Sequence, residues 1–206
     1  MADISPPAFP ERNETARIEA FSDGVLAIVV TLLVLELKVP RGLESEQAVR
    51  HALADEWHAY LAFLTSFATV GIMWVNHHRL FTLIGRVDHW LLMLNLLLLL
   101  TISVVPFPTA VVSEYLGGGG ATIATLVLGG VYLVTAIVFN AIWRYAAHGR
   151  RLIAAHVPQA IVDAQTRQYR FGPIVYLVAF LAALVSPTLS VALNLAIAVF
   201  FALPLR

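Results

Sequence analysis

Six apolar segments separated by polar connections make up most of the chain. They lie at about residues 20–39, 54–81, 87–112, 121–147, 171–186 and 188–204. Crossing the roughly 30 Å hydrocarbon core of a bilayer takes about 20 helical residues at ~1.5 Å per residue. None of the segments alternates apolar and polar positions, which favours helices over the strands of a barrel. The pattern therefore predicts an all-α membrane protein with six transmembrane helices, the last two of them short.

Three polar or irregular features refine this reading. The connection 148–170 is the longest and most charged, and its pattern is compatible with a helix in the membrane interface. Pro106 and Pro108 are expected to kink or end the third helix. Asn95 and Thr101, in the same segment, are expected to hydrogen-bond locally or to another helix. The residues "SPT" at 186–188 predict a tight hairpin between the last two segments.

Composition agrees with a membrane protein. Of 206 residues, 59% are hydrophobic and 13% are charged, whereas a soluble domain has about 25% charged residues. Cysteine is absent, which excludes disulfides, thiol catalysis and cysteine metal sites. The N-terminal residues lack the pattern of a cleavable signal peptide.

The distribution of arginine and lysine predicts the orientation, because cytoplasmic loops carry an excess of both. With the N-terminus inside, the cytoplasmic segments hold Arg12, Arg17, Arg79, Arg86, Arg144, Arg150, Arg151, Arg167, Arg170 and Arg206. The outer segments hold only Lys38, Arg41 and Arg50. We therefore expect a multi-pass protein of the cell (inner) membrane with both termini in the cytoplasm. Residues 1–14 are expected to form a flexible cytoplasmic tail, and residues 15–206 a single six-span domain.

The first apolar segment begins with a concentration of polar residues. In "RIEAFSDGVLAIVVTLLVLELKVP", residues 17–40, the side chains of Arg17, Glu19, Ser22 and Asp23 precede a largely aliphatic run. Polar residues inside a membrane helix are costly and mark either a function or a polar partner. A second polar group, "WVNHHRLF" at 74–81, stands near the end of the second segment.

These two motifs resemble the signature of the endosomal and lysosomal transmembrane potassium channel family, in particular its six-span prokaryotic members. The matching positions are Arg17, Phe21, Ser22, Asp23 and Gly24 in the first motif and Trp74, Asn76, His77 and His78 in the second. The resemblance implies a passive, potassium-permeable channel without the usual "TVGYG" filter, which is absent here too. It also implies a homotetramer whose four first helices surround the pore, with a constriction made by apolar side chains of that helix.

Helical geometry separates the polar residues of the first segment from one apolar stripe. At about 100° per residue, a stripe about 100° wide contains Gly24, Ile28, Thr31, Leu32 and Leu35. Ser22 and Asp23 lie about +120° and −140° from Ile28, well away from it. If the stripe faces a pore, Ile28, Leu32 and Leu35 are the expected gate, because apolar rings close a pore by dewetting. Thr31 carries the only hydroxyl on the stripe, so it is the candidate for selectivity.

Ser22 and Asp23 are expected to hold the first helix to its neighbours through a polar network that sets its tilt and hence gating. The candidate partners are Arg17, Trp74, Asn76, His77 and His78. Two simpler interpretations stay open: the stripe is an ordinary lipid- or protein-facing surface, and Ser22 and Asp23 cap the helix N-terminus. His77 and His78 are adjacent, so they cannot form the i, i+4 pair of a helical metal site.

A secondary transporter is the alternative function, with Asp23, His77 and His78 as a proton relay. The sequence shows neither an internal repeat nor helices broken near the bilayer midplane, which disfavours it. The four glycines at 117–120 lack a following Lys-Ser/Thr and so are not a phosphate loop. With no set of nucleophile, base and orienting residue and no histidine-rich metal pattern, we expect neither an enzyme nor a bound cofactor or metal. The expected partners are copies of the same chain, the bilayer and permeant K⁺, and not nucleic acid.

Overall fold

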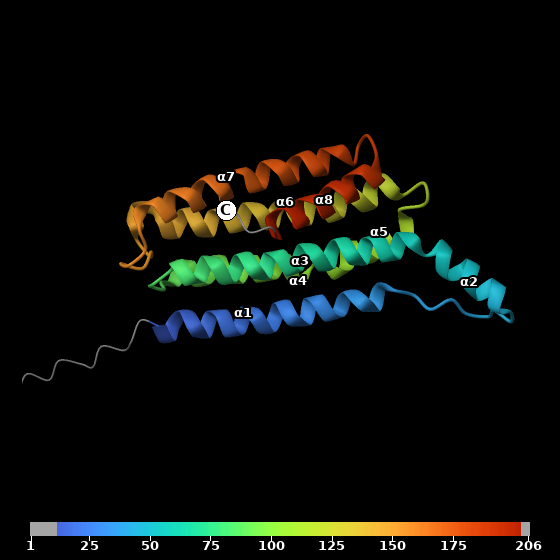
Figure 1. Cartoon of the computed structure of the whole chain (residues 1–206), viewed down its shortest axis with the longest axis horizontal. Coiled ribbons are helices and arrows are strands. Elements are labelled where there is room, and N and C mark those ends of the chain that lie inside the picture. The colour runs from blue at the N-terminus through green and yellow to red at the C-terminus, as the bar shows by residue number, and fades with distance from the viewer. Residues whose placement is uncertain (1–11, 203–206) are drawn as a thin grey trace, which may run out of the picture.

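The computed structural model describes residues 12–202, which are helical almost throughout (Figure 1). The elements are α1 (Arg12–Leu32), the 3-10 helix η1 (Leu33–Glu36), α2 (Glu46–Asp55), α3 (Trp57–Leu83), α4 (His89–Ser103), α5 (Pro106–Tyr115), α6 (Ala121–Ala147), η2 (His148–Arg150), α7 (Gln159–Ala182) and α8 (Pro187–Ala202). The expected all-α architecture is confirmed for this range. α1 already begins at Arg12, so residues 12–14 are helical rather than part of a tail, and residues 1–11 lie outside the described range.

The long helices run back and forth along one axis, with α1 at the edge of the bundle (Figure 1). α1 packs on α3 and α4, and these two helices separate it from α6, α7 and α8. One face of α1 is therefore left uncovered by the described part of the chain. We call the end of the bundle at which α1 begins the basal end and the opposite end the distal end.

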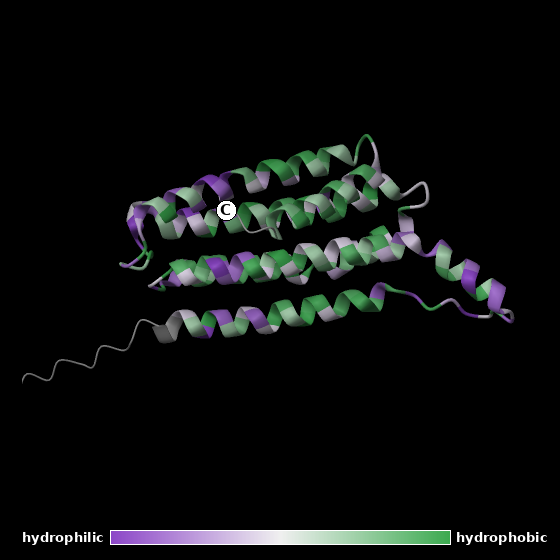
Figure 2. Cartoon of the chain, viewed as in Figure 1, coloured by the Kyte–Doolittle hydropathy of each residue, from purple (hydrophilic) through white to green (hydrophobic). Residues whose placement is uncertain are grey.

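Four segments within residues 12–202 are long and apolar enough to cross a membrane. They are Thr15–Glu36, Trp57–Leu83, His89–Tyr115 and Ala121–Arg150. α8 has only 16 residues, and the first half of α7 is hydrophilic (Figure 2). Hydrophilic residues also gather in α2 and in the basal halves of α1 and α3, whereas the distal parts of α1, α7 and α8 are mostly apolar (Figure 2).

α7 begins earlier than its apolar segment suggested, and this corrects the interpretation of the preceding connection. No separate interfacial helix lies between residues 148 and 170, because residues 159–170 form the first half of α7. Val162, Tyr169 and Tyr176 are buried at seven-residue spacing along α7, and α7 packs closely on α6. α7 therefore begins well before its apolar segment, because its packing on α6 extends into the hydrophilic first half of the helix.

The third apolar segment is divided into two helices at its prolines, in agreement with the expectation that Pro106 and Pro108 kink or end the helix. α4 ends at Ser103 and α5 begins at Pro106, which has no backbone N–H to continue the helix. Buried hydroxyls brace the break: Thr109 Oγ1 donates to the carbonyl of Val105 at 2.8 Å, and Ser66 of α3 lies 2.7 Å from Thr109 Oγ1. The hydroxyl of Tyr132 of α6 donates to Ser66 Oγ at 2.8 Å. The break is thereby attached to two neighbouring helices.

The two basal connections are joined to each other. Ile84 and Ile153 form an isolated antiparallel bridge, and Gly85 N–H donates to the carbonyl of Leu152 at 2.9 Å. A Cβ atom at position 85 would lie 2.8 Å from Ala154 Cα, so only glycine permits this approach. The bridge holds the end of α3 against the beginning of the segment that leads to α7.

Asp88 fixes the start of α4 beside this bridge. Its Oδ1 accepts a hydrogen bond from Leu91 N–H at 2.9 Å, and its Oδ2 accepts one from the Tyr145 hydroxyl at 2.6 Å. Partial burial alone would raise the pKa of Asp88, but these hydrogen bonds and the nearby Arg151 lower it below its ordinary value. The carboxylate therefore stays ionised and serves as the N-cap of α4.

Pro173 lies inside α7 and creates a second local irregularity. Proline has no backbone N–H, so the carbonyl of Tyr169, four residues earlier, loses its helical donor. Asn140 of α6 replaces that donor: its Nδ2 donates to the Tyr169 carbonyl at 2.7 Å. A side chain of one helix thus satisfies the backbone of the next and fixes the rotation of α6 against α7.

We predict that Asn140→Leu lowers the free energy of unfolding by about 1–3 kcal/mol, since it leaves a buried carbonyl without a donor. In a Pro173→Ala background the same substitution is expected to cost less, because alanine restores the helical N–H for Tyr169. The four proteins of this double-mutant cycle can be compared by unfolding in mixed micelles. Strictly additive effects would show that Asn140 does not substitute for the missing donor.

Candidate functional site

α1 has one buried face and one uncovered face. Its buried residues are Ile18, Ser22, Leu26 and Val29, followed by Leu33 in η1. On the uncovered face, Ile28 is 60% exposed, Leu32 41% and Leu35 71%. Gly24 and Thr31 are exposed as well. The stripe expected from helical geometry therefore coincides with the face that the described part of the chain leaves open.

Thr31 provides an oxygen on this face. Its Oγ1 donates to the carbonyl of Ile28 at 2.8 Å, one turn earlier in the same helix. Because this bond uses the hydroxyl proton, the oxygen lone pairs of Thr31 remain available to a donor or a cation outside the helix. On this face of α1, each chain thus presents the hydroxyl oxygen of Thr31 among the apolar side chains of Ile28, Leu32 and Leu35.

Phe21 and Arg17 extend the same face toward the basal end, and the sequence analysis did not assign them to it. At about 100° per residue they lie about +20° and −20° from Ile28, in line with the stripe. Phe21 is 57% exposed, and Arg17 is exposed too. The helical positions of both residues contain this signal, whereas the prediction from the sequence places Arg17 in the polar network.

Three helices meet at one buried chain of hydrogen bonds. Asn95 of α4 donates from Nδ2 to Ser22 Oγ of α1 at 3.1 Å, and its Oδ1 lies 3.0 Å from Nε2 of His77 of α3. With the Asn95 amide in this orientation, Oδ1 is an acceptor and His77 Nε2–H is the donor. Ser22, Asn95 and His77 are all buried. Asn95 belongs to neither motif, although the sequence predicted that it bonds locally or to another helix.

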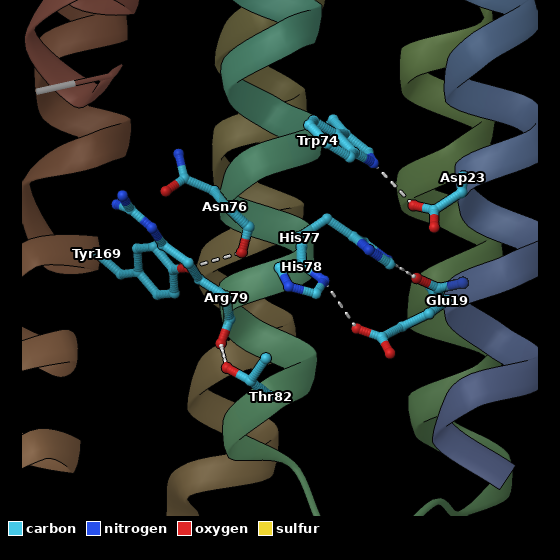
Figure 3. A network of polar contacts seen from close by, with 10 residues as sticks. Glu19, Asp23, Trp74, Asn76, His77, His78, Arg79, Thr82 and Tyr169 are labelled. Carbon is cyan, nitrogen blue, oxygen red and sulfur yellow. Dashed lines mark hydrogen bonds and ion pairs between the residues drawn. The ribbon is translucent and has the colours of Figure 1, made fainter. Parts of the chain in front are cut away.

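Two more polar contacts tie the basal half of α1 to α3. The indole Nε1 of Trp74 donates to Asp23 Oδ1 at 2.9 Å, and His78 Nδ1 lies 3.4 Å from Glu19 Oε1. Figure 3 shows Trp74, His77 and His78 all pointing from α3 toward α1. Together with the buried chain, these contacts attach α1 at three successive levels.

Two predicted members of the network lie elsewhere. Arg17 makes no hydrogen bond or ion pair with Ser22 or Asp23 within residues 12–202; it lines a groove between α1 and α4. The side chain of Asn76 points away from α1 (Figure 3), and its backbone carbonyl accepts a hydrogen bond from the Tyr169 hydroxyl at 3.3 Å. At about 100° per residue, Asn76 lies about 200° around α3 from both Trp74 and His78, so its side chain points away from α1.

Helix capping does not explain Ser22 and Asp23. α1 begins at Arg12, so both residues lie well inside the helix. The N–H groups at that depth are already bonded to carbonyls of the preceding turn, and no free donor remains for a capping side chain.

The distal end of α1 is held by a different contact. Lys38 forms an ion pair and hydrogen bond with Glu114 of α5. The hydrogen bond to this carboxylate raises the pKa of Lys38 above its ordinary value. Within residues 12–202, no group of three or more His, Cys, Asp or Glu residues is placed to hold a metal ion.

Comparison with known proteins identifies the family. The family described as endosomal/lysosomal potassium channel TMEM175 matches residues 17–106, which include both motifs. A potassium channel of Chamaesiphon minutus is 51% identical over 94% of this chain and 96% of its own length. The endosomal/lysosomal proton channel TMEM175 of Gallus gallus is 35% identical over 63% of this chain and 28% of its own length.

A solved structure agrees with this assignment. The crystal structure of a lysosomal potassium-selective channel TMEM175 homolog from Chamaesiphon minutus has a TM-score of 0.83 and 50% identity, covering 92% of this chain and 97% of that one. The resemblance seen in the two motifs is confirmed, since the likeness extends over nearly the whole chain. This protein therefore belongs to the TMEM175 family of transmembrane potassium channels, whose members are passive ion channels and not enzymes.

Proposed function

We propose that this protein is a potassium-permeable channel that conducts passively through a pore lined by α1 in a homotetramer. The observation that carries the proposal is the uncovered stripe of α1, which lies opposite the face that is locked to α3 and α4. α1 stands at the edge of the bundle, so one chain cannot enclose a pore. Several copies with their stripes toward a common axis can do so, and the number four comes from the family resemblance.

In this arrangement Ile28, Leu32 and Leu35 form rings that act as the gate. Their side chains offer no oxygen to replace the hydration shell of K⁺, so the rings exclude water and ions when narrow and conduct when wide enough to be wet. The four Thr31 hydroxyls form the only oxygen ring on the stripe. We assign to them a contribution to K⁺ selectivity.

The polar contacts behind the stripe set the position of α1. In this proposal Ser22 and Asp23, with Trp74, His77, His78 and the additional Asn95, fix its rotation and tilt and so influence gating. Among residues 12–202, Arg17 and Asn76 take no part in these contacts, and Arg17 instead lies in line with the stripe near the basal end.

We further propose that the chain spans the cell (inner) membrane six times, with α7 and α8 as the short fifth and sixth spans. The basal connections carry Arg86, Arg150 and Arg151, which favours a cytoplasmic basal end and cytoplasmic termini. The proposal needs no bound cofactor, and K⁺ passes as the permeant ion.

A proton-coupled transporter is the second candidate. It is favoured by the break between α4 and α5 and by His77 Nδ1, which is buried without a hydrogen-bond partner in the described chain. Recordings from purified protein in a planar bilayer separate the two. Unitary K⁺ currents that vary linearly with driving force support a channel, and their absence alongside proton-dependent K⁺ uptake supports the transporter.

We predict that Ile28→Asn increases K⁺ flux into liposomes about tenfold, because a polar ring lowers the dewetting barrier by about 1.4 kcal/mol. Ile137→Asn is the matched control, since Ile137 is a half-exposed isoleucine in the middle of α6, away from α1. An increase of equal size in both variants would mean that a polar residue merely makes the protein leaky.

Thr31→Ala is expected to lower the K⁺/Na⁺ permeability ratio two- to fivefold, about the effect of losing one neutral oxygen contact. Reversal potentials under bi-ionic conditions measure that ratio. Thr101→Ala is the control, because Thr101 of α4 makes the same kind of bond, to the Leu98 carbonyl at 2.8 Å. An unaltered ratio in Thr31→Ala would remove Thr31 from selectivity.

Asp23→Asn keeps an oxygen that accepts from Trp74 but removes the charge. We expect the tetramer to assemble and its open probability to change, because the position of α1 depends on this contact. Size-exclusion chromatography reports assembly, and single-channel recording reports conductance and gating. If assembly, conductance and gating are all unchanged, the carboxylate has no role in holding the helix.

A further inference from the structure

A groove runs along the flank of α1 that faces α3. It has a volume of about 470 Å³, and the residues that line it include Asp23 and Ala27 of α1 and Phe67, Gly71 and Trp74 of α3. A Cβ atom at position 71 would meet no other atom within 4 Å, so the groove is open beside Gly71. Ala27, Phe67 and Trp74 are exposed in the single chain. The groove lies beside the stripe, on another side of the same helix.

Asp23 shows what kind of molecule covers this groove. It lies within the apolar span Thr15–Glu36, yet it is exposed in the single chain and accepts from Trp74, which is itself 47% exposed. An ionisable side chain inside a membrane span faces protein or water, because an ion is costly in hydrocarbon. Asp23 lies about 140° around α1 from Ile28, so the water of the proposed pore does not reach it. The groove therefore calls for a covering protein surface.

Symmetry decides which surface of a second copy meets the groove. In a ring of identical copies, each copy presents one flank to the next copy and its opposite flank to the previous one. The opposite flank of α1 faces α4, where Leu92 and Leu96 line the groove between the two helices. There α4 exposes Leu92, Leu96 and Leu100, by 37%, 47% and 61%. Their four-residue spacing makes a ridge of the kind that packs into a groove of another helix.

The heights of the ridge and the groove agree. Rotation about an axis along the bundle leaves every residue at its own height, and α1 and α4 both run from the basal to the distal end. Asn95 donates to Ser22, so the residues that follow them, Leu96 and Asp23, lie at about one height. Both helices rise about 1.5 Å per residue. Leu100 therefore lies about one turn above Asp23, at the middle of the groove.

We propose that the groove between α1 and α3 of one copy binds the α4 ridge of the next copy. Leu100 packs beside Gly71 and Ala27, and Leu96 shields Asp23 from lipid. Small residues at a contact let membrane helices approach closely, which the open space at Gly71 permits. This contact rests on the proposed function, since it names the surfaces by which pore-forming copies meet.

Cysteine cross-linking tests the contact directly, because the chain has no cysteine of its own. Full-length Ala27→Cys and Leu100→Cys chains with different tags are co-expressed, reconstituted in liposomes and oxidised. We expect a disulfide-linked pair that carries both tags. Either variant alone should give no cross-link, because each surface meets the other and not itself.

Ile137→Cys in place of Leu100→Cys is the matched control, since Ile137 is half-exposed on α6, away from α1. A disulfide needs Cα atoms within about 7 Å, so the mixed product should be about tenfold more abundant with Leu100→Cys than with this control. Equal yields, or no mixed product, overturn the proposed contact. The latter is the result expected if lipid fills the groove.

A second test fills the groove. Gly71→Leu should raise the protein concentration at which the assembly dissociates by about tenfold, because the added side chain takes the place of Leu100. Gly172→Leu, at a glycine of α7 that also has no atom within 4 Å of an added Cβ, should not change it. Adding Leu100→Ala to Gly71→Leu should restore association. An assembly that Gly71→Leu leaves unchanged overturns the contact, and the cross-link decides if that variant does not fold.

The cross-link is independent of conduction, so the two proposals fail separately. Unitary K⁺ currents without the mixed product overturn the contact and leave the channel standing. The mixed product in protein that carries no unitary current supports the contact and overturns the proposed function.

Discussion

The arrangement of α1 depends on one buried chain of hydrogen bonds, from His77 through Asn95 to Ser22. It joins α3, α4 and α1 at a point that the protein shields completely. Rotation of any one helix would leave a buried polar group without a partner, at a cost of roughly 1–3 kcal/mol for each group. No water is available in the hydrocarbon core to replace the lost bond. Since the stripe lies on the opposite side of α1 from Ser22, fixing Ser22 inward also fixes the stripe outward.

The two halves of α1 are held by different kinds of contact. In the basal half, Trp74 donates a hydrogen bond to Asp23 and His78 lies beside the carboxylate of Glu19, in addition to the buried chain. The distal half is held by apolar packing of Leu26, Val29 and Leu33 until Lys38 meets Glu114 beyond the helix. Apolar contact is not directional and tolerates small shifts, and η1 replaces the α-helical bonds of the last turn by the weaker 3-10 pattern. The proposed gate thus lies in the part of α1 whose packing permits movement.

The sequence predicted the features that follow from helical periodicity. It did not predict the features that depend on which residues of different helices meet in the folded chain. The two faces of α1 follow from about 100° per residue, and α6 has the predicted bounds because polar connections flank it on both sides. The start of α7 was missed because packing of Val162 and Tyr169 on α6 extends the helix beyond the apolar run. Asn76 was placed with His77 because they are neighbours in a motif, although helical geometry turns them apart. Asn95 joins α1 to α3 from inside a leucine run, and no single-helix pattern indicates which helix it meets.

The two polar residues of the first motif lie away from the stripe, and this constrains how the proposed pore can select ions. Ser22 is buried and accepts from Asn95, and Asp23 accepts from Trp74, so neither places its oxygen on the stripe. The remaining oxygen, Thr31 Oγ1, donates to the carbonyl of Ile28 and therefore moves with the turn that carries the Ile28 side chain. Any rotation of α1 that widens the ring of Ile28 also displaces the ring of Thr31. In such a pore, gating and selectivity are coupled, because the Ile28 ring and the Thr31 ring lie on the same turn of α1.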